Sequence, residues 1–347
     1  MAQFDYVVFV GRFEPFHLGH LAVLRHALEL APRAIVLIGS ADAPRSARNP
    51  WTFEERAVMI RSALGDQADR LIVLQLADHL YNETAWVAEV QDQVAAAIAG
   101  DSGKSAAPPR VALIGHEKDA TSYYLHAFPQ WALADVNQVA MLSASDLRRQ
   151  LFAGDEGAAH LLQANVPPAV FAMVEAFRAT EPFARVAVEF HHVEAYKKAW
   201  AEAPYAPTFV TADAVVVHSG HVLLIRRKSQ PGRGLWALPG GFVNQDETLL
   251  EAAIRELREE TRLKIPAPVL RGSLKDRAVF DHPDRSLRGR TITHAFYFDF
   301  PAGPLPSVRG SDDAARARWT PVAEVRRLRS HLFEDHFFIL EHFLGAG

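Results

Sequence analysis

Ten residues near the start of the chain combine side chains that bind phosphate. They follow a short apolar run and read Gly11-Arg12-Phe13-Glu14-Pro15-Phe16-His17-Leu18-Gly19-His20. A glycine turn lets the backbone approach a ligand, and the helix that follows directs N–H groups at an anion. Two histidines at i and i+3 share one face of that helix and can donate to phosphate oxygens. The string predicts a phosphate site at a strand-to-helix turn; the alternative is a pair of surface or metal-binding histidines.

A second group of such side chains lies in the C-terminal half. Pro239-Gly240-Gly241 precedes Glu247, and then comes Arg255-Glu256-Leu257-Arg258-Glu259-Glu260. On a helix, Glu256, Glu259 and Glu260 fall on one patch. Carboxylates so close together repel one another unless a cation is present, and oxygen ligands suit Mg²⁺ or Mn²⁺. The spacing predicts a divalent-cation site, with Glu247 pairing with Arg255 if the chain bends; the alternative is a solvated acidic helix face.

The elements around the first group alternate between strands and helices. Apolar runs predict strands at 6–10, 34–39, 71–76 and 110–115, and helical patterns occupy 18–30, a stretch from Thr52, and 85–99. Thr52 with Glu55 has the pattern of a capping box. The alternation is typical of a parallel sheet with helices on both faces. Lys118 follows the fourth strand, where ligands of such sheets bind, and is a candidate phosphate ligand.

The pattern changes after Pro207. We expect paired strands at 214–217 and 222–225, a helix from Glu247 to Thr261 capped by Asp246, strands at 278–280 and 291–300, and a helical C-terminus at about 321–343. Residues 178–208 contain three prolines around a short helical stretch near 193–200, which predicts a connection between two domains. The predicted organisation is a first domain at 1–185, a connector at 186–206, and a mixed-sheet domain at 207–347.

Composition excludes several classes of protein. The 347 residues include no cysteine, which excludes disulfides, thiolate metal sites and cysteine nucleophiles. Lys and Arg number 37 against 41 Asp and Glu, which argues against nucleic-acid binding. No apolar run approaches the length of a membrane span, and the N-terminus lacks the pattern of a signal peptide. We expect a cytoplasmic protein that binds neither membrane nor nucleic acid, as a monomer or a homo-oligomer.

The first string resembles the H-x-G-H signature of the nucleotidyltransferase superfamily, and more narrowly nicotinamide mononucleotide (NMN) adenylyltransferase of the archaeal type. Two further segments support the narrower resemblance. Arg48-Asn49-Pro50-Trp51-Thr52 with Arg56 is similar to the family's R-[ND]-P-[FW]-T-x-x-x-R segment. Ser143-Ala144-Ser145-Asp146-Leu147-Arg148 is similar to its I-S-x-T-x-x-R motif, with Ser145 keeping the hydroxyl of the threonine. The resemblance implies an α/β fold with a Rossmann-like parallel sheet.

The resemblance also implies a reaction: ATP and NMN give NAD and pyrophosphate, with Mg²⁺ present. The NMN phosphate attacks the α-phosphorus in line, so catalysis is positioning and charge stabilisation. The implied ATP and phosphate site is Gly11, Arg12, Phe13, His17, His20, Lys118, Ser143, Ser145 and Arg148, with His17, His20 and Arg148 acting in catalysis. The implied NMN site is Arg48, Asp78, Asn82 and Trp86. The alternatives are Trp86 as a core residue and Arg56 as a structural ion-pair partner.

The second group resembles the Nudix box, G-x5-E-x7-R-E-U-x-E-E-x-G-U, where U is aliphatic. Arg262 stands where the family has the glycine that ends the catalytic helix, a position where positive φ is common. The resemblance implies a mixed-sheet α/β/α sandwich and metal ligands Glu256, Glu259 and Glu260, the last two also catalytic. The segment 280–290 is predicted to hold substrate phosphate through Arg285, Arg288 and Arg290. Candidates for a further metal ligand or base are Asp281, Asp284, Asp312 and Asp313.

Both motif sets in this order resemble the bifunctional NMN adenylyltransferase/Nudix hydrolase proteins. In that family the Nudix half is commonly an ADP-ribose pyrophosphatase that produces AMP and ribose 5-phosphate. Two alternatives stay open for this half: another substrate, such as NADH or a dinucleoside polyphosphate, and a non-catalytic sensor of ADP-ribose or NAD. The three carboxylates favour a hydrolase, because a sensor does not need them. The choice between NMN and nicotinate mononucleotide is also open.

Overall fold

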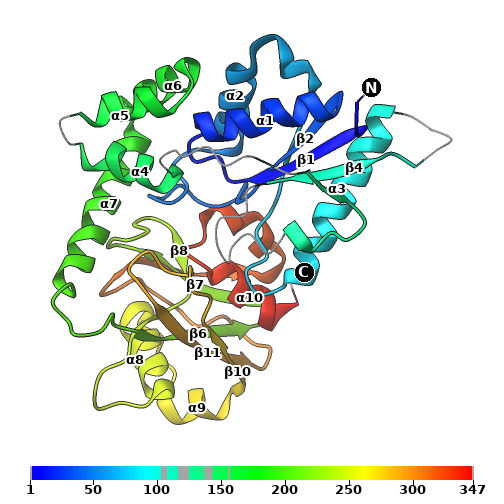
Figure 1. Cartoon of the computed structure of the whole chain (residues 1–347). Helices are drawn as coiled ribbons and strands as arrows, with labels where there is room; N and C mark the ends of the chain where they lie inside the picture. Colours follow the sequence, from blue (N-terminus) through cyan, green and yellow to red (C-terminus); the bar gives the residue numbers. More distant parts are fainter. Residues whose placement is uncertain are drawn as a thin grey trace. The chain divides into compact units, whose positions relative to one another are not determined.

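Strand β1 (Tyr6–Gly11) is the centre of a five-stranded parallel sheet in the first part of the chain (Figure 1). The computed structural model describes residues 2–102, 108–115, 125–134, 136, 143–154 and 157–345. The strand order is β3-β2-β1-β4-β5, and each neighbouring pair is parallel. The other strands are β2 (Arg33–Ile38), β3 (Leu71–Gln75), β4 (Val111–Ile114) and β5 (Ala132–Ala134).

Helices connect these strands, as the alternating pattern predicts. They are α1 (Leu18–Leu30), α2 (Phe53–Leu64), the short 3₁₀ helix η1 (Gly65–Arg70) and α3 (Glu83–Ser102). From β1 the chain proceeds to β2 on one side, and after β3 it returns to β4 on the other side of β1. Ligands bind at the carboxyl ends of strands where the order reverses in this way. The loop after β1, which carries the first string, is therefore at that switch point.

Four helices follow the parallel sheet: α4 (Ala144–Ala153), α5 (Ala158–Asn165), α6 (Pro168–Arg178) and α7 (Glu181–Ala199). The prediction of a short helix near 193–200 was wrong, because α7 has 19 residues. Pro182 is the second residue of α7, in the first turn, where proline removes no hydrogen bond from the helix. Within α7 the chain divides into two compact units, Met1–Val188 and Glu189–Gly347.

The second unit contains a seven-stranded mixed sheet (Figure 1). The main strand order is β10-β11-β6-β7-β12; β6 and β11 are parallel, and the other pairs are antiparallel. Two short strands extend the sheet, β8 beside β7 and β9 beside β6. The strands are β6 (Phe209–His218), β7 (His221–Arg227), β8 (Trp236–Ala237), β9 (Gly240–Phe242), β10 (Leu274–Phe280), β11 (Thr291–Phe300) and β12 (Ala314–Pro321).

Helices cover both faces of the mixed sheet because β6 and β7 bury both of their faces. Ala212, Ala214 and Val216 of β6 pack in one core with α8 (Leu249–Thr261) and α9 (Ala267–Gly272). Val215 and Val217 pack in the other core with the 3₁₀ helix η3 (Val322–His331) and α10 (His336–Leu344). The alternation follows from the two-residue period of a strand. It confirms the predicted α/β/α sandwich.

Several boundaries in this unit differ from the predictions; strand β6, for example, begins five residues earlier, at Phe209. Thr248, not Asp246, caps α8, since its hydroxyl accepts from the N–H of Glu251 and the Glu251 carboxylate accepts in return. Strand β10 begins four residues earlier, at Leu274; the edge position of β10 exposes polar residues that hide a strand pattern. The C-terminal segment is two helices separated at Leu332–Asp335.

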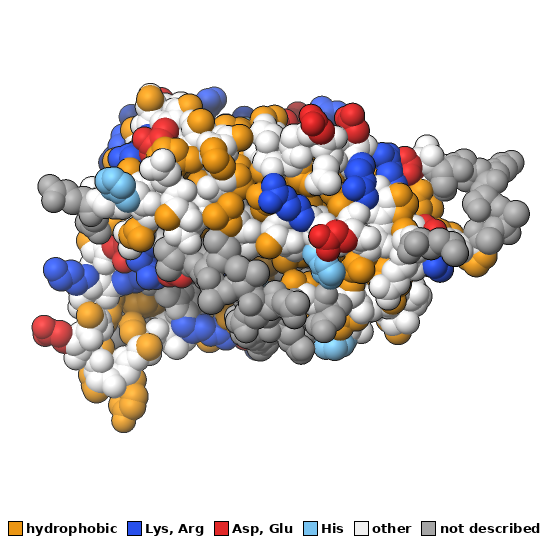
Figure 2. Space-filling model, turned by 45° about the horizontal axis from the view of Figure 1, so that its top comes forward, with side chains coloured by type: hydrophobic (Ala, Val, Ile, Leu, Met, Phe, Trp, Pro, Cys, Tyr) orange, Lys and Arg blue, Asp and Glu red, His pale blue; other side chains and the backbone are white. Residues whose placement is uncertain are grey.

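The surface carries charges of both signs. On the face drawn in Figure 2, basic and acidic side chains are interspersed among apolar ones, and the coloured residues there form no continuous basic area. Among the described residues, no helix is both long and apolar enough to cross a membrane.

Candidate functional site

His17 and His20 cap the helix that follows β1. Nδ1 of His17 accepts hydrogen bonds from the backbone N–H groups of Gly19 (3.1 Å) and His20 (3.4 Å). Nδ1 of His20 accepts from the N–H of His17 (3.3 Å), and the two rings stack with their centroids 3.6 Å apart. A neutral ring whose Nδ1 accepts carries its proton on Nε2. Both histidines can therefore present an N–H donor while they complete the helix N-terminus.

The turn that leads to this helix is tightly packed. Phe13 has a φ of 57°, and its ring is buried against Gly11. A Cβ at Gly11 would lie 2.8 Å from that ring, so glycine is required there for packing. The Phe13 ring also meets His20 edge-on at 5.0 Å. Any ligand contact of Phe13 is consequently confined to its backbone.

Arg148 extends from α4 toward the same turn. Ser143 caps α4 in a capping box with Asp146, and Ser145 Oγ accepts a hydrogen bond from Arg148 Nη2 at 3.1 Å. Burial, together with the charges of Arg12 and Arg48, lowers the pKa of Arg148 to about 10. The guanidinium groups of Arg12 and Arg48 are therefore near enough to Arg148 to repel it. A cationic cluster of this kind favours a polyanion such as a triphosphate.

Arg56 and Glu14 form a buried ion pair beneath this cluster. Each side chain is 1% exposed, and Arg56 Nε lies 3.2 Å from Glu14 Oε1. Arg56 also donates to three backbone carbonyls at the ends of β1 and β2, those of Arg12, Gly39 and Ser40. The structure thus places Arg56 as a structural residue that ties two strand ends together, the alternative considered for it above.

Replacing Arg56 by methionine should lower the free energy of unfolding of the first unit by about 3–5 kcal/mol, because it leaves a buried carboxylate without its cation. Thermal and denaturant unfolding of the full chain measure this loss. Arg61→Met on the same helix is the control: Arg61 is exposed, and its loss should cost at most about 0.5 kcal/mol. Equal stability of the two variants would contradict the structural role of Arg56.

The predicted NMN residues follow β2 and β3. Ser40, two residues after β2, donates to Asp78 Oδ1 at 3.1 Å. Asn82 Oδ1 accepts from the N–H of Ala85 at the start of α3. Trp86 lies 6.0 Å from Phe128 and is partly buried against the core, so part of its ring serves packing. Arg48 belongs to the cationic cluster described above. Lys118 lies outside the described residues.

Arg255 connects the acidic side chains of the second group. It binds Glu247 through Nε (2.9 Å) and Nη2 (2.6 Å), and through Nη1 it binds Glu256 (2.8 Å) and Glu259 (3.0 Å). The Arg255 hydrogen bonds hold the pKa of Glu247 near 2. The pair predicted between Glu247 and Arg255 is therefore present, and it fastens the loop before α8 to the helix.

The glycine turn lies against two of the predicted metal ligands. Glu260 Oε2 accepts a hydrogen bond from the N–H of Gly240 at 3.0 Å, and a Cβ at Gly241 would collide with the carboxylate of Glu256. Burial, aided by the charge of Glu256, raises the pKa of Glu260 to about 8. Burial likewise raises the pKa of Glu256. Buried carboxylates that repel one another become stable as anions when a cation binds between them.

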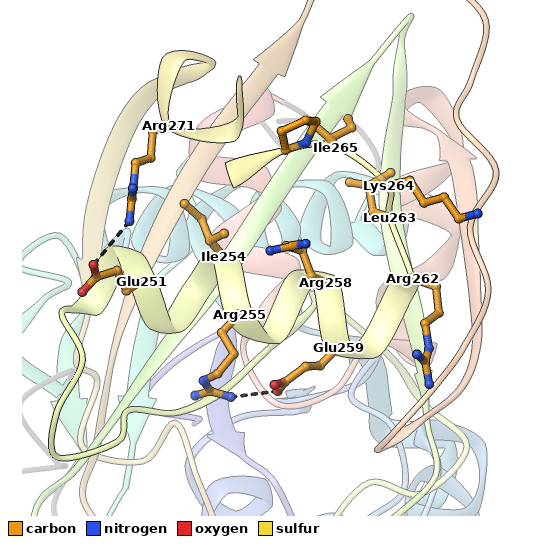
Figure 3. Close-up of a pocket in the computed structure, with 11 residues that line it drawn as sticks. Glu251, Ile254, Arg255, Arg258, Glu259, Arg262, Leu263, Lys264, Ile265 and Arg271 are labelled. Carbon is orange, nitrogen blue, oxygen red and sulfur yellow. Dashed lines mark hydrogen bonds and ion pairs between the residues drawn. The ribbon is translucent and has the colours of Figure 1, made fainter. Parts of the chain in front are cut away.

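These donors fit a divalent cation in chemistry, but they are not arranged as ligands here. No three His, Asp or Glu side chains of the described residues form a group that could hold a metal ion. Arg255 bridges Glu256 and Glu259, and Glu259 lies on the outer face of α8 (Figure 3). That face borders a groove of about 860 Å³, which Glu256 and Glu260 do not line. Of the four additional acidic candidates, Asp312 contributes its charge to the raised pKa of Glu256.

The three predicted substrate arginines have different surroundings. Arg285 is buried and forms a bidentate pair with Asp335 at 2.7 and 2.8 Å. Arg288 lies over the ring of Phe242 at 5.1 Å. Arg290 pairs with Asp281 at 3.4 Å near the surface. Arg285 therefore holds the loop in place, whereas Arg288 packs on Phe242, which directly follows the glycine turn.

Comparisons with known proteins agree with the resemblances of both groups of side chains. Residues 8–101 match the cytidylyltransferase-like family, and residues 207–340 match the NUDIX domain family. The nicotinamide/nicotinic acid mononucleotide adenylyltransferase of Acinetobacter baylyi is 38% identical over 157 residues, 44% of this chain and 79% of that protein. The ADP-ribose pyrophosphatase of Methanocaldococcus jannaschii is 34% identical over 140 residues, 40% of this chain and 75% of that protein.

A solved structure matches this chain over 99% of its length. It is a bifunctional NMN adenylyltransferase/ADP-ribose pyrophosphatase from Francisella tularensis, complexed with AMP and a manganese ion. The two chains are 34% identical with a TM-score of 0.90, over 99% of this chain and 100% of that one. This chain belongs to the bifunctional NMN adenylyltransferase/ADP-ribose pyrophosphatase family. The predicted family and fold class are thereby confirmed.

The family's glycine at the end of the Nudix helix is replaced by Arg262 without loss of the turn. Arg262 adopts the left-handed conformation, with a φ of 54°, and its N–H donates to the carbonyl of Arg258. Its side chain donates to Ser311 Oγ at 2.8 Å. The helix therefore ends as a glycine would end it, at the energetic cost of a positive φ in a residue with a side chain.

Arg262→Gly should raise the free energy of unfolding by less than about 1 kcal/mol, since relief of the positive φ is partly offset by loss of the Ser311 hydrogen bond. Differential scanning calorimetry of the full chain measures this gain. We expect the rate of nucleotide hydrolysis to change by less than about twofold, because the backbone already has the required geometry. A large gain in rate would show that Arg262 impairs the site.

Sequence reasoning missed two parts of this site. Asp213 of β6 is buried, accepts a hydrogen bond from Thr293, and lies against Gly240. Burial raises its pKa to about 6. A charged residue inside the apolar run of β6 was the available signal. The second missed part is the segment Phe333–His336, whose contacts with the site come entirely from tertiary structure.

Proposed function

We propose that the first unit transfers AMP from ATP to NMN, which gives NAD and pyrophosphate. The cationic groups of Arg12, Arg48 and Arg148, of which Arg148 binds the backbone of Glu14 in the turn before the two histidines, carry this proposal. The arginines neutralise the triphosphate, and the Nε2–H groups of His17 and His20 donate to its oxygens. These contacts hold the α-phosphorus in line with the attacking NMN phosphate, and no protein nucleophile is required. The name of the Acinetobacter relative supports the same substrate class.

Trp86→Ala tests the assignment of the nicotinamide site. If Trp86 stacks on the pyridine ring, the KM for NMN should rise about tenfold while the KM for ATP stays nearly constant, since loss of one stacking contact costs about 1–1.5 kcal/mol. NAD synthesis with NMN and with nicotinate mononucleotide, at varied ATP, measures both constants. An unchanged KM for NMN would refute this assignment.

For the second unit, we propose hydrolysis of ADP-ribose to AMP and ribose 5-phosphate. The buried carboxylates of Glu256 and Glu260 beside the glycine turn carry this proposal. With Glu259 they would hold Mg²⁺ or Mn²⁺; when bound, such a cation neutralises pyrophosphate charge and activates water. Arg288 would bind a substrate phosphate, and Arg285 keeps the loop of Arg288 in place. The Methanocaldococcus relative and the Francisella complex support this substrate and metal class.

The test is hydrolysis of ADP-ribose, NAD, NADH and a dinucleoside tetraphosphate by the full chain, with Mg²⁺ and with EDTA. We expect AMP from ADP-ribose at a kcat/KM at least about tenfold above the others, and no product in EDTA. A preference for NADH or the dinucleoside tetraphosphate would show that ADP-ribose is not the main substrate. Absence of any hydrolysis, with NAD synthesis intact, would point to the sensor alternative.

A further inference from the structure

Four consecutive residues, Phe333 to His336, which lead into α10, contact three parts of the hydrolase site. The N–H of Phe333 donates to the carbonyl of Trp236 in β8 at 2.8 Å. Asp335 accepts both hydrogen bonds of Arg285 from the arginine loop 281–290, and Glu334 lies 3.9 Å from Arg288 of the same loop. His336 contacts the segment that leads into the glycine turn.

The backbone of this segment is held in an uncommon conformation. Glu334 has a φ of 45°, in the left-handed region, which residues with side chains rarely adopt. One of its carboxylate oxygens, Oε1, is buried and has no hydrogen-bond partner among the described residues. Such strain persists where the surrounding structure over-determines it, and it concentrates at functional sites. Here the conformation lets neighbouring residues reach separate loops.

His336 contacts the chain two residues before the glycine that binds Glu260. Its Nδ1 accepts a hydrogen bond from the N–H of Leu238 at 2.8 Å, and both residues are buried. The ring therefore carries its proton on Nε2. Two residues beyond Leu238, the N–H of Gly240 binds Glu260, and Gly241 follows against Glu256. A single acceptor atom thus fixes one end of the turn that faces both carboxylates.

We propose that His336 is a positioning residue of the hydrolase site, which aligns the turn 238–241 with Glu256 and Glu260. Because Asp335 holds the arginine loop from the adjacent position, the same segment links the glycine turn to the arginine loop. Outer contacts of this kind typically change metal affinity by 10- to 100-fold when they are removed. The inference rests on the hydrolase function proposed above.

The experiment compares His336→Asn with His336→Gln in the full chain. The amide oxygen of asparagine can take the place of Nδ1, whereas that of glutamine lies one methylene farther out, near the place of Nε2. Mn²⁺ affinity is measured by electron paramagnetic resonance without nucleotide, with Glu260→Gln as the baseline. The kcat and KM for ADP-ribose are measured in parallel, and NAD synthesis by the same sample controls for folding of the first unit.

We expect His336→Asn to retain Mn²⁺ affinity within about threefold, and His336→Gln to lose about 10-fold or more, with a matching fall in kcat. Equal losses in the two variants, or wild-type Mn²⁺ affinity in His336→Gln, would overturn the inference. Unfolding of the second unit in His336→Gln, seen as a lost calorimetric transition, would also overturn it, because the contact would then serve stability. If the wild type hydrolyses no ADP-ribose, the proposed function fails, while the Mn²⁺ affinities still decide the role of His336.

Discussion

Replacing Glu260 by glutamine is expected to lower ADP-ribose hydrolysis by about 10³-fold, equivalent to about 4 kcal/mol, and to leave NAD synthesis unchanged. Glutamine has the size of glutamate, and its amide oxygen can still accept from the N–H of Gly240. The variant therefore removes the negative charge and keeps the packing. Because the charge is what a divalent cation requires, hydrolysis should fail while the fold persists. Initial rates of AMP release at saturating Mg²⁺ measure the effect.

Glu251→Gln is the matched control for this variant. Glu251 lies on the same helix, but it is exposed and binds Thr248 and Arg271. Its neutralisation should change the rate of hydrolysis by less than about twofold, as is usual for a surface substitution. If Glu260→Gln kept more than about a tenth of the wild-type rate, Glu260 would not be an essential metal ligand. NAD synthesis in both samples shows whether the first unit is intact.

The second large effect is expected in the first unit. His17→Asn should lower NAD synthesis by about 10²- to 10³-fold, the usual loss when one donor to developing phosphate charge is removed. Asparagine is a good N-cap residue and can accept from the backbone where Nδ1 of His17 now accepts. It does not supply the Nε2–H donor. The variant thus separates the catalytic role of His17 from its capping role.

Two further variants complete the comparison for His17. His17→Ala removes both roles and should also lower the free energy of unfolding by about 1 kcal/mol. His26→Asn, an exposed position on the same helix beside Glu29, should change neither quantity appreciably. Kinetics of NAD formation and thermal unfolding are measured on all three proteins. Wild-type synthesis by His17→Asn would contradict the phosphate role of His17.

Local sequence patterns were sufficient where the interacting residues are close in the chain. The spacing of the two histidines predicted that they share a helix face, and the structure stacks their rings. The capping box at Thr52 was also readable, because a helix fixes the separation of residues one turn apart. The pairing of Glu247 with Arg255 was predicted on condition that the chain bends, and the bend is made by the loop before α8. The same patterns misplaced the cap of α8 by two residues, since Asp246 and Thr248 are both good caps.

The sequence by itself determined the family, the two-part α/β architecture and the identity of the chemistry-bearing motifs. Tertiary structure decided which of those residues are available to a ligand. It pairs Arg56 with Glu14 and Arg285 with Asp335 in buried ion pairs. It also brought His336 to Leu238, 98 residues away. No spacing rule connects residues that far apart, because their contact depends on how strands and helices pack. The arrangement around the glycine turn therefore became visible only in the folded chain.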